Sequence, residues 1–359
     1  MSETRSERQP RLGKPLRVLL VDDSAFMRGA VARLLTSDGR FEVVGQAGDG
    51  TEGVKLALEL NPDVISMDYN MPGLNGAAAT RAILTERAIP IVMLSAHTRE
   101  GEAATVEALT AGAVDYVTKP EGEVSVNLTF IKDELIRKLL SAAGVNLAFR
   151  LAGPPSTAGS RPSSPRKVAP AGLKLVVIAC STGGPAALAE VIPALRLEDR
   201  AALLIVQHMA AGYTRALAAQ LAEKARFPVK EAETGIDLKA GAAWVAAGDQ
   251  HLFVDSRNRL ALSEAPLVNG VRPAADVTLA SVAGQFGARS LGVILTGMGK
   301  DGARGLAQLK AAGGVTLAQD RGSSTVYGMP KAAVELGVVD TVAPLARMAA
   351  LINRWVSEG

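Results

Sequence analysis

Residues 173–185 read LKLVVIACSTGGP, a largely apolar run that ends abruptly in hydroxyl and glycine residues. The chain then continues with a helical pattern, AALAEVIPAL. A short apolar run bounded by glycine and proline and followed by a helical pattern is typical of a buried strand and its crossover helix. This stretch therefore predicts one β–α unit of a parallel α/β fold.

Three further runs in the same half of the chain have this character: AALLIVQH at 201–208, RSLGVILT at 289–296 and GVTLAQ at 314–319. Helical patterns lie between them, so we predict a mainly parallel, doubly wound α/β domain over residues 172–359. Residues 242–264 differ, because short β runs are broken there by Gly-Asp and Ser-Arg-Asn turns. We expect an antiparallel insert at that point and a mixed sheet.

The amino-terminal half shows a similar repeat, in which each apolar run is followed by an amphipathic helical pattern. This predicts a second doubly wound domain over residues 16–146, with a site at the carboxyl ends of its strands. The five runs are LRVLLV, FEVVGQA, DVISMD, IPIVMLSA and AVDYVTK.

The composition of the 359 residues is that of a globular protein, with 48% hydrophobic and 21% charged residues. The net charge of +3 is mild and only 4% of the residues are aromatic, so we expect no nucleic-acid partner. No apolar run reaches the roughly 18 residues of a membrane helix, so we expect no membrane insertion. The single cysteine, Cys180, excludes an internal disulfide and a cysteine-based metal cluster, which fits a reducing cytoplasm.

Two segments outside the predicted domains are polar. Residues 1–15 have no following hydrophobic segment, so we interpret them as a disordered lead-in rather than a signal peptide. Residues 147–171 include GPPSTAGSRPSSPRKVAPA, which is rich in Pro, Ser, Gly and Ala and has no apolar period. We expect an extended, cationic linker there.

Three carboxylates follow strands of the first domain: Asp22 and Asp23 after LRVLLV, and Asp68 after VISM. They should converge at the carboxyl edge of the sheet, where their repulsion requires a cation, and oxygen ligands favour Mg²⁺. Ser95 ends the fourth run and Lys119 the fifth, where a hydroxyl and an ammonium can hold phosphoryl oxygens on Asp68. A carboxylate nucleophile beside Mg²⁺ and lysine is a phosphoryl acceptor.

Asp-Asp after the first run, Asp after the third, Ser-Ala after the fourth and Lys-Pro after the fifth resemble the receiver domain of two-component response regulators. The resemblance implies a flavodoxin-like fold and phosphorylation of Asp68 by a histidine kinase. The Mg²⁺ ligands that it implies are Asp22, Asp23, Asp68 and the backbone carbonyl of Asn70. The residues that it implies for phosphoryl sensing are Ser95, Lys119 and Tyr116. Core packing is the alternative role of Tyr116.

In the second domain, Ser181 lies at a strand-to-helix turn, which exposes its Oγ and directs helix amides towards an oxyanion. A helix cap is the alternative role. A serine nucleophile needs a base, and His208 ends AALLIVQH at the sheet edge expected for Ser181, whereas His251 lies in the insert. Asp301 follows the run RSLGVILT and can fix the histidine tautomer.

The stretch TGMGKDG, residues 296–302, also matches the dinucleotide-binding pattern G-x-G-x-x-G, and Asp320 follows it at roughly the 20-residue spacing of that pattern. Alternatively, its glycines let the backbone approach the reacting centre, and the amides of Met298 and Thr182 hold the oxyanion. We favour the second interpretation because it uses the serine, the histidine and the aspartate together.

ACSTGGP, VQHM and LTGMGKDGARG, joined to an amino-terminal receiver, resemble the chemotaxis protein-glutamate methylesterase family over nearly the whole chain. The resemblance implies a triad of Ser181, His208 and Asp301 that hydrolyses glutamate methyl esters on methylated chemoreceptors and releases methanol. Some members also deamidate receptor glutamines. It further implies Mg²⁺ for receiver phosphorylation, no cofactor for ester hydrolysis, a histidine kinase of a chemosensory system as partner, and inhibition by the unphosphorylated receiver.

Three other interpretations are open. A dinucleotide-dependent oxidoreductase would use the glycines of TGMGKDG with Asp320 and leave the serine idle. An α/β-hydrolase-like esterase would use Ser181, Asp249 and His251, although the first glycine of G-x-S-x-G is missing. A response regulator without catalysis would use its second half only to bind a partner or DNA. Cys180 is not expected to be the nucleophile, because neighbouring strand residues face opposite sides.

Overall fold

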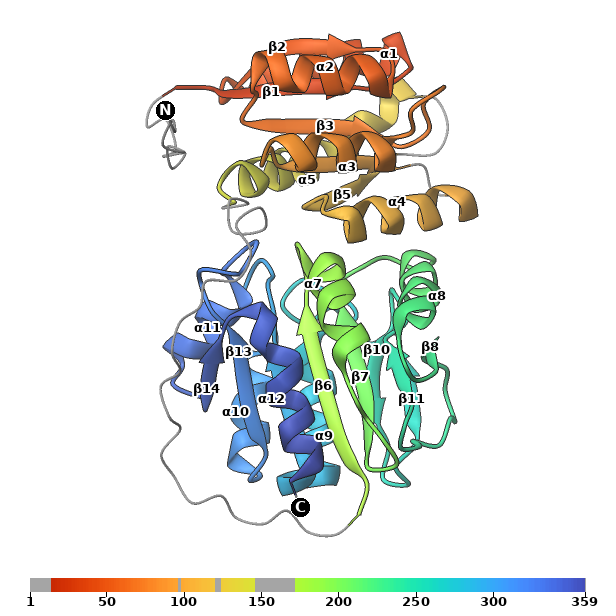
Figure 1. Cartoon of the computed structure of the whole chain (residues 1–359), viewed down its shortest axis with the longest axis vertical. Coiled ribbons are helices and arrows are strands. Elements are labelled where there is room, and N and C mark those ends of the chain that lie inside the picture. The colour runs from red at the N-terminus through yellow and green to blue at the C-terminus, as the bar shows by residue number, and fades with distance from the viewer. Residues whose placement is uncertain (1–13, 96–97, 120–123, 146–171, 359) are drawn as a thin grey trace. The chain divides into compact units, whose positions relative to one another are not determined.

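The computed structural model describes residues 14–95, 98–119, 124–145 and 172–358. The predicted lead-in lies almost entirely outside the described residues, and the predicted linker at 147–171 lies wholly outside them. The chain divides into two compact units, each built around one parallel sheet (Figure 1). Among the described residues, no helix is both long and apolar enough to cross a bilayer.

The first unit contains a five-stranded parallel sheet in the order β2-β1-β3-β4-β5. This is the strand order of flavodoxin-like folds, which confirms the predicted fold class. Each strand coincides with one of the predicted runs: β1 (Leu16–Val21), β2 (Phe41–Ala47), β3 (Val64–Asp68), β4 (Ile91–Ser95) and β5 (Asp115–Thr118).

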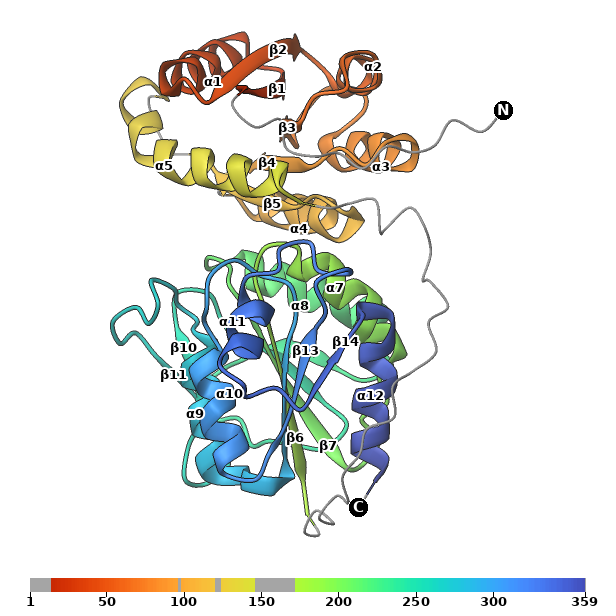
Figure 2. The same cartoon turned by 90° about the vertical axis from the view of Figure 1, so that its left-hand side faces the viewer.

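Helices α1 and α5 lie on one face of this sheet, and α2 and α3 lie on the other (Figure 2). Met27 and Leu35 of α1 and Leu139 of α5 belong to one buried cluster with Val18 and Leu20 of β1. Polar side chains cap three of the helices: Ser24 at α1, Asp49 at α2 and Asn75 at α3. The helices that alternate with these five strands along the chain are α1 (Ala25–Asp38), α2 (Gly50–Leu60), α3 (Gly76–Glu86), α4 (Arg99–Ala111) and α5 (Val124–Ala143).

The second unit is built on a seven-stranded sheet in the order β14-β13-β12-β6-β7-β9-β8, in which every neighbouring pair is parallel. β6 and β7 are buried along their whole length, as their apolar runs predicted. The strands are β6 (Lys174–Cys180), β7 (Ala201–Gln207), β8 (Val229–Glu231), β9 (Ala243–Val245), β12 (Ser290–Ile294), β13 (Val315–Gln319) and β14 (Thr341–Ala343).

Helices α9 and α10 pack together on one face of this sheet, and α7 and α12 lie on the other (Figure 2). The lysine of β6, Lys174, is buried because its ammonium donates to the carbonyls of Trp355 and Val356 at the end of α12. The helices described in this unit are α7 (Gly184–Val191), α8 (Tyr213–Lys224), α9 (Ala275–Phe286), α10 (Ala303–Ala311), α11 (Met329–Glu335) and α12 (Leu345–Ser357).

The predicted antiparallel insert is confirmed, but it is shorter than 242–264 and leaves the main sheet unmixed. The first run of that stretch, β9, pairs in parallel with β7 and belongs to the main sheet. Only β10 (His251–Val254) and β11 (Leu260–Ser263) form an antiparallel hairpin, which is a separate two-stranded sheet. The prediction of a mixed sheet was wrong because a run as short as β9 does not show in sequence which strand it pairs with.

In both sheets, the strand that follows the first strand in the chain pairs with one side of it, and a later strand pairs with its other side. β1 has β2 and β3 as its two neighbours, and β6 has β7 and β12. The switch points therefore lie between β1 and β3 and between β6 and β12. Ligands of open α/β sheets bind in the crevice outside the carboxyl ends of the strands at such points.

Candidate functional sites

The first switch point gathers carboxylates, as the sequence predicted. Asp22 follows β1 and Asp68 ends β3, and both are buried, whereas Asp23 is exposed. One oxygen of each carboxylate lies within 4.8 Å of the others. Lys119, which follows β5, places its ammonium 2.9 Å from Asp22 Oδ2 and 2.9 Å from Asp68 Oδ1. This all-oxygen donor set fits Mg²⁺.

Burial dominates the protonation behaviour of this acidic cluster. It raises the pKa of Asp68 to about 6; Lys119 opposes the shift and the Asp22 carboxylate adds to it. Burial acts to lower the pKa of Lys119, but the two carboxylates outweigh it and the pKa lies above its ordinary value. One ammonium beside three carboxylates leaves excess negative charge, which a divalent cation would neutralise.

The remaining residues predicted for this site lie on β4, on β5 and in the loop after β3. Ser95 is buried at the end of β4, and its Oγ donates to Gly101 O at 3.3 Å. Tyr116 of β5 is 6% exposed, and the Lys138 ammonium lies 4.8 Å from its ring centre. Tyr116 is thus packed in the core in this structure. Asn70 is exposed in the loop after β3.

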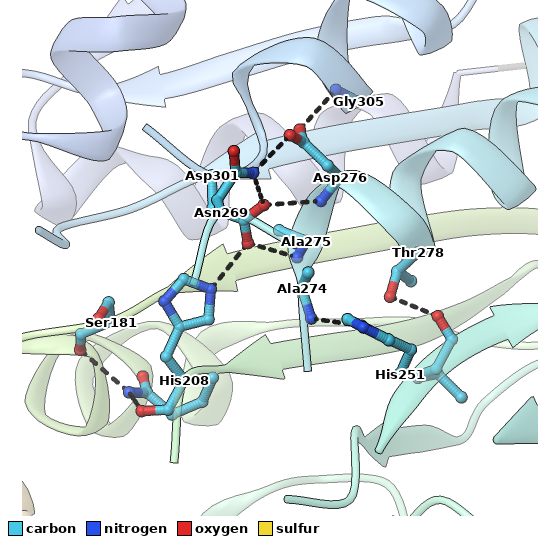
Figure 3. Close-up of polar contacts among 12 residues, drawn as sticks. Ser181, His208, His251, Asn269, Ala274, Ala275, Asp276, Thr278, Asp301 and Gly305 are labelled. Carbon is cyan, nitrogen blue, oxygen red and sulfur yellow. Dashed lines mark hydrogen bonds and ion pairs between the residues drawn. The ribbon is translucent and has the colours of Figure 1, made fainter. Parts of the chain in front are cut away.

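At the second switch point, a hydroxyl, an imidazole and a carboxylate come together from three separate connections. Ser181 follows β6, His208 follows β7, and Asp301 lies between β12 and α10. His208 Nε2 lies 2.8 Å from Asp301 Oδ2. Figure 3 shows the imidazole between the carboxylate and Ser181, with its other nitrogen, Nδ1, on the side of Ser181. This is the order of groups in a serine hydrolase.

The backbone of Ser181 is held on both sides while its hydroxyl has no hydrogen-bond partner among the described residues. The Ser181 N–H donates to Thr296 O at 3.0 Å. Its carbonyl accepts from Gly184 N–H at 2.7 Å and from Gln207 Nε2 at 3.0 Å. The turn is therefore fixed, and the Oγ is available for a substrate.

The stretch TGMGKDG lies directly beside the serine. A Cβ at Gly297 would lie 2.9 Å from Ser181 Cβ and 2.3 Å from Met329 Sδ, so only glycine allows this approach. Gly302 has a φ of 88°, a left-handed conformation that leads into α10. The glycines thus serve close packing and a tight turn at the serine, in agreement with the interpretation that the sequence favoured.

Both predicted oxyanion donors belong to segments that flank Ser181. Thr182 is buried, and its carbonyl accepts from Thr296 Oγ1 at 2.9 Å. Met298 follows Gly297 in the loop after β12. Their role in holding an oxyanion stays a prediction.

Asp301 is buried and accepts four hydrogen bonds (Figure 3). Its Oδ2 accepts from His208 and, at 2.6 Å, from Ala275 N–H. Its Oδ1 accepts from Asn269 Nδ2 at 2.8 Å and from Asp276 N–H at 3.2 Å. Burial alone would raise the pKa of Asp301, but the hydrogen bonds, foremost that of His208, outweigh it and hold the pKa below its ordinary value. The first turn of α9 thus stabilises an ionised Asp301.

The alternative triad is not assembled. His251 is buried, and both of its ring nitrogens contact backbone groups: Nδ1 accepts from Ala274 N–H at 3.2 Å, and Nε2 lies 3.0 Å from Pro266 O. Asp249 Oδ2 accepts from Ala211 N–H at 3.3 Å. These residues bind backbone and do not bind each other.

Two further alternatives also lose support. Asp320 Oδ1 accepts from the N–H and the Oγ of Ser323 at 2.9 and 2.6 Å, so the acid of the dinucleotide pattern closes a local turn. Cys180 is fully buried, and burial raises the pKa of its thiol, which keeps it protonated. Cys180 is a packing residue, as the sequence predicted.

Sequence reasoning missed three donors to Asp301: the side chain of Asn269 and the N–H groups of Ala275 and Asp276. The sequence VNGV at 268–271 is a signal for a two-residue turn, and the structure forms this turn. Nothing in the sequence shows that the turn reaches Asp301, because 32 residues separate Asn269 from it.

The fold and sites define a class of protein: an amino-terminal receiver-type α/β unit followed by an α/β unit with the geometry of a serine hydrolase. Residues 176–352 match the family model for CheB methylesterase, and residues 18–127 match that for the response regulator receiver domain. A protein-glutamate methylesterase/protein-glutamine glutaminase of Symbiobacterium thermophilum is 47% identical over 97% of this chain and 99% of that protein.

Two further comparisons agree. A protein of the same name from Pyrococcus abyssi is 42% identical over 97% of this chain and 95% of that protein. The crystal structure of the Thermotoga maritima CheB methylesterase catalytic domain superposes with a TM-score of 0.50 at 39% identity, over 51% of this chain and 99% of that domain. The chain therefore belongs to the protein-glutamate methylesterase/protein-glutamine glutaminase family, as its motifs predicted.

Proposed function

We propose that this protein hydrolyses glutamate methyl esters on chemoreceptors and releases methanol. One observation carries the proposal: the His208 imidazole lies between the Asp301 carboxylate and Ser181 at the switch point of the second sheet (Figure 3). The names of the relatives support a glutamate methyl ester of a protein as the substrate.

In the proposed mechanism, Asp301 accepts a hydrogen bond from the Nε2–H of His208. The unprotonated Nδ1 is therefore the base. Ser181 Oγ attacks the ester carbonyl while Nδ1 takes the hydroxyl proton and passes it to the departing methoxide. Methanol leaves, and water attacks the acyl-enzyme with the same base to release the glutamate carboxylate. General-base assistance of this kind contributes about 10²- to 10⁴-fold in rate.

The amides of Met298 and Thr182 are the proposed donors to the oxyanion of the tetrahedral intermediate. A single donor of this type is worth about 10²- to 10³-fold in rate. The reaction needs only water as second substrate, so we propose no cofactor for this step. A receptor glutamine would follow the same route with ammonia as the leaving group, which fits the second part of the relatives' name.

We propose that a histidine kinase of a chemosensory system phosphorylates Asp68. Asp22, Asp23, Asp68 and the carbonyl of Asn70 would hold Mg²⁺, which neutralises charge during phosphoryl transfer. Lys119 already contacts Asp68 Oδ1 at 2.9 Å and would hold a phosphoryl oxygen.

Ser95 and Tyr116 are the proposed sensors of the phosphoryl group. Phosphorylation would raise esterase activity by shifting the receiver between two conformations. Residues 16–146 and 172–359 would be the two functional domains of a cytoplasmic enzyme.

The direct test is methanol release from a methylated chemoreceptor by the intact chain, with and without a small-molecule phosphodonor. We expect methanol in both reactions and more of it with the phosphodonor and Mg²⁺. A chain without residues 1–170 should release methanol faster than the unphosphorylated intact chain, because it lacks the inhibiting receiver. An unchanged or lower rate would count against this inhibition. Absence of methanol in every reaction would contradict the esterase assignment.

A further inference from the structure

Asn269 occupies a position between two carboxylates beside the proposed triad. Its Nδ2 donates to Asp301 Oδ1 at 2.8 Å and to Asp276 Oδ2 at 2.8 Å (Figure 3). An amide nitrogen carries two hydrogens, so this pair of bonds uses its full donor capacity. The side-chain orientation of Asn269 is therefore determined, because its carbonyl oxygen could not replace Nδ2 between two acceptors.

The backbone around Asn269 is equally constrained. Val268 and Val271 exchange two hydrogen bonds, of 3.2 and 3.0 Å, which close a two-residue turn. Asn269 and Gly270 both have left-handed φ values, 54° and 78°, the conformation that an Asn-Gly turn favours. His251 secures the same loop at two points, Pro266 O and Ala274 N–H.

The second carboxylate, Asp276, is itself fixed. Its Oδ1 accepts from Gly305 N–H at 2.8 Å in the first turn of α10, where Gly302 supplies no side-chain cap. Asp276 thus caps α10 from the neighbouring helix α9 and presents its other oxygen to Asn269. The hydrogen bond between Gly305 and Asp276 thus links α10 to α9 beside Asp301.

The consequence for Asp301 is that its carboxylate plane has one orientation. Two of its four bonds come from the first turn of α9, and within the described part of the chain Asn269 is the one side-chain donor to Asp301 other than His208. A rotated carboxylate would lose the Asn269 bond and move Oδ2 away from His208 Nε2. We propose that Asn269 is a positioning residue that holds Asp301 so that His208 keeps its proton on Nε2 and presents Nδ1 to Ser181. This inference rests on the proposed function.

The test uses Asn269→Gly in the full chain, which removes the amide but retains the left-handed backbone. The matched control is Asn258→Gly. Asn258 is another asparagine with positive φ, 58°, in the exposed β10–β11 hairpin turn. Methanol release from a methylated chemoreceptor, measured with a phosphodonor present, gives kcat and KM. Nitrogen-15 NMR of the His208 ring reports which nitrogen carries the proton.

We expect Asn269→Gly to lower kcat by about 10- to 100-fold, with KM changed less than threefold, because the loss concerns positioning of the reacting groups. The His208 signals should show loss of the pure Nε2–H form. Asn258→Gly should match the wild type in both measurements. A folded Asn269→Gly variant with wild-type kcat and an intact Nε2–H tautomer would overturn the proposal.

Asn269→Asp keeps the shape of the side chain and the turn and provides the same test if the glycine variant does not fold. An ionised Asp donates no hydrogen bond, so we expect a similar or larger fall in kcat and the same tautomer change; wild-type values in both would again overturn the proposal. The NMR measurement does not depend on esterase activity. If the wild type released no methanol, the proposed function would fail, while the tautomer comparison would still decide the role of Asn269.

Discussion

Asp68 and Asp301 occupy equivalent places in the two units and are both buried, yet their pKa values are shifted in opposite directions. Each lies at the carboxyl edge of a parallel sheet, at the point where strand order reverses, and each is nearly inaccessible to solvent. The pKa of Asp68 is raised to about 6 by burial, whereas hydrogen bonds hold the pKa of Asp301 below its ordinary value. The fold supplies the location, and the neighbouring groups decide the chemistry.

The difference lies in how well each carboxylate is satisfied. Asp301 accepts four hydrogen bonds, two of them from the first turn of α9, so it needs nothing more to stay ionised. Asp68 faces a second buried carboxylate, Asp22, and shares one ammonium with it. A carboxylate whose charge is fully balanced by hydrogen bonds suits a rigid catalytic group. A carboxylate with too little compensation suits a site that changes state when a cation or a phosphoryl group binds.

The largest expected effect is at the serine. Ser181→Ala should lower methanol release by about 10⁴- to 10⁶-fold, as loss of a triad nucleophile does. A serine-directed electrophile should label the wild type and not this variant. Cys180→Ala is the matched control and should retain both labelling and activity, because its thiol is buried and protonated. If labelling were lost in Cys180→Ala and retained in Ser181→Ala, the nucleophile would be Cys180 and not Ser181.

The next effect is at the carboxylate of the second unit. Asp301→Asn should lower methanol release by about 10²- to 10⁴-fold, because the amide cannot fix the His208 tautomer as a carboxylate does. Asp249→Asn alters the acid of the alternative triad and should leave activity within about threefold, because the Asn side-chain oxygen can still accept the Ala211 N–H bond. Equal losses of activity in the two variants would support the alternative triad of Ser181, Asp249 and His251.

A smaller effect on turnover is expected in the first unit. Asp68→Asn should abolish incorporation of an acyl phosphate and all stimulation by the phosphodonor while leaving basal methanol release in place. Asp49→Asn changes another carboxylate of the same unit, and its amide can still cap α2, so stimulation should persist. Stimulation that survived Asp68→Asn would move the acceptor to another residue.

The smallest expected effect is on thermal stability, and it tests the contrast between the pKa values of Asp68 and Asp301. The folded pKa of Asp68, about 6, lies above its ordinary value of 3.8, so ionisation disfavours folding as pH rises between these values. The cost is about 3 kcal/mol at most and is fully present at neutral pH. Without Mg²⁺, Asp68→Asn should raise the Tm of the first unit at pH 7 by several degrees. The gain should vanish below pH 4, and a lower Tm at pH 7 would contradict the assigned cause.

In the same measurement of Tm against pH, removing the Asp301 carboxylate should change Tm in the opposite direction. Its lowered pKa contributes stability that is present above pH 3.8 and is lost as pH falls through the folded pKa. Asp301→Asn should therefore lower the Tm of the second unit at pH 7. A rise in Tm would show that its four hydrogen bonds do not offset burial.

Local pattern was sufficient for most of the architecture. The apolar runs at residues 16–21 and 173–180 became β1 and a fully buried β6, because a strand covered on both faces must be apolar throughout. The polar residues that follow such strands reach the same edge of a parallel sheet by topology alone. For this reason the sequence could anticipate that the segments carrying Ser181, His208 and Asp301 would lie at the same edge of the sheet.

Only the tertiary structure decided how those groups are supported and where the short strands pair. β9 joined the main sheet through long-range pairing with β7, which three residues of sequence do not encode. Asn269 and the first turn of α9 reach Asp301 through packing of elements far apart in the chain. Strand periodicity and strand-end chemistry are local properties written in consecutive residues, whereas a hydrogen bond across 32 residues depends on how whole helices and turns pack in space.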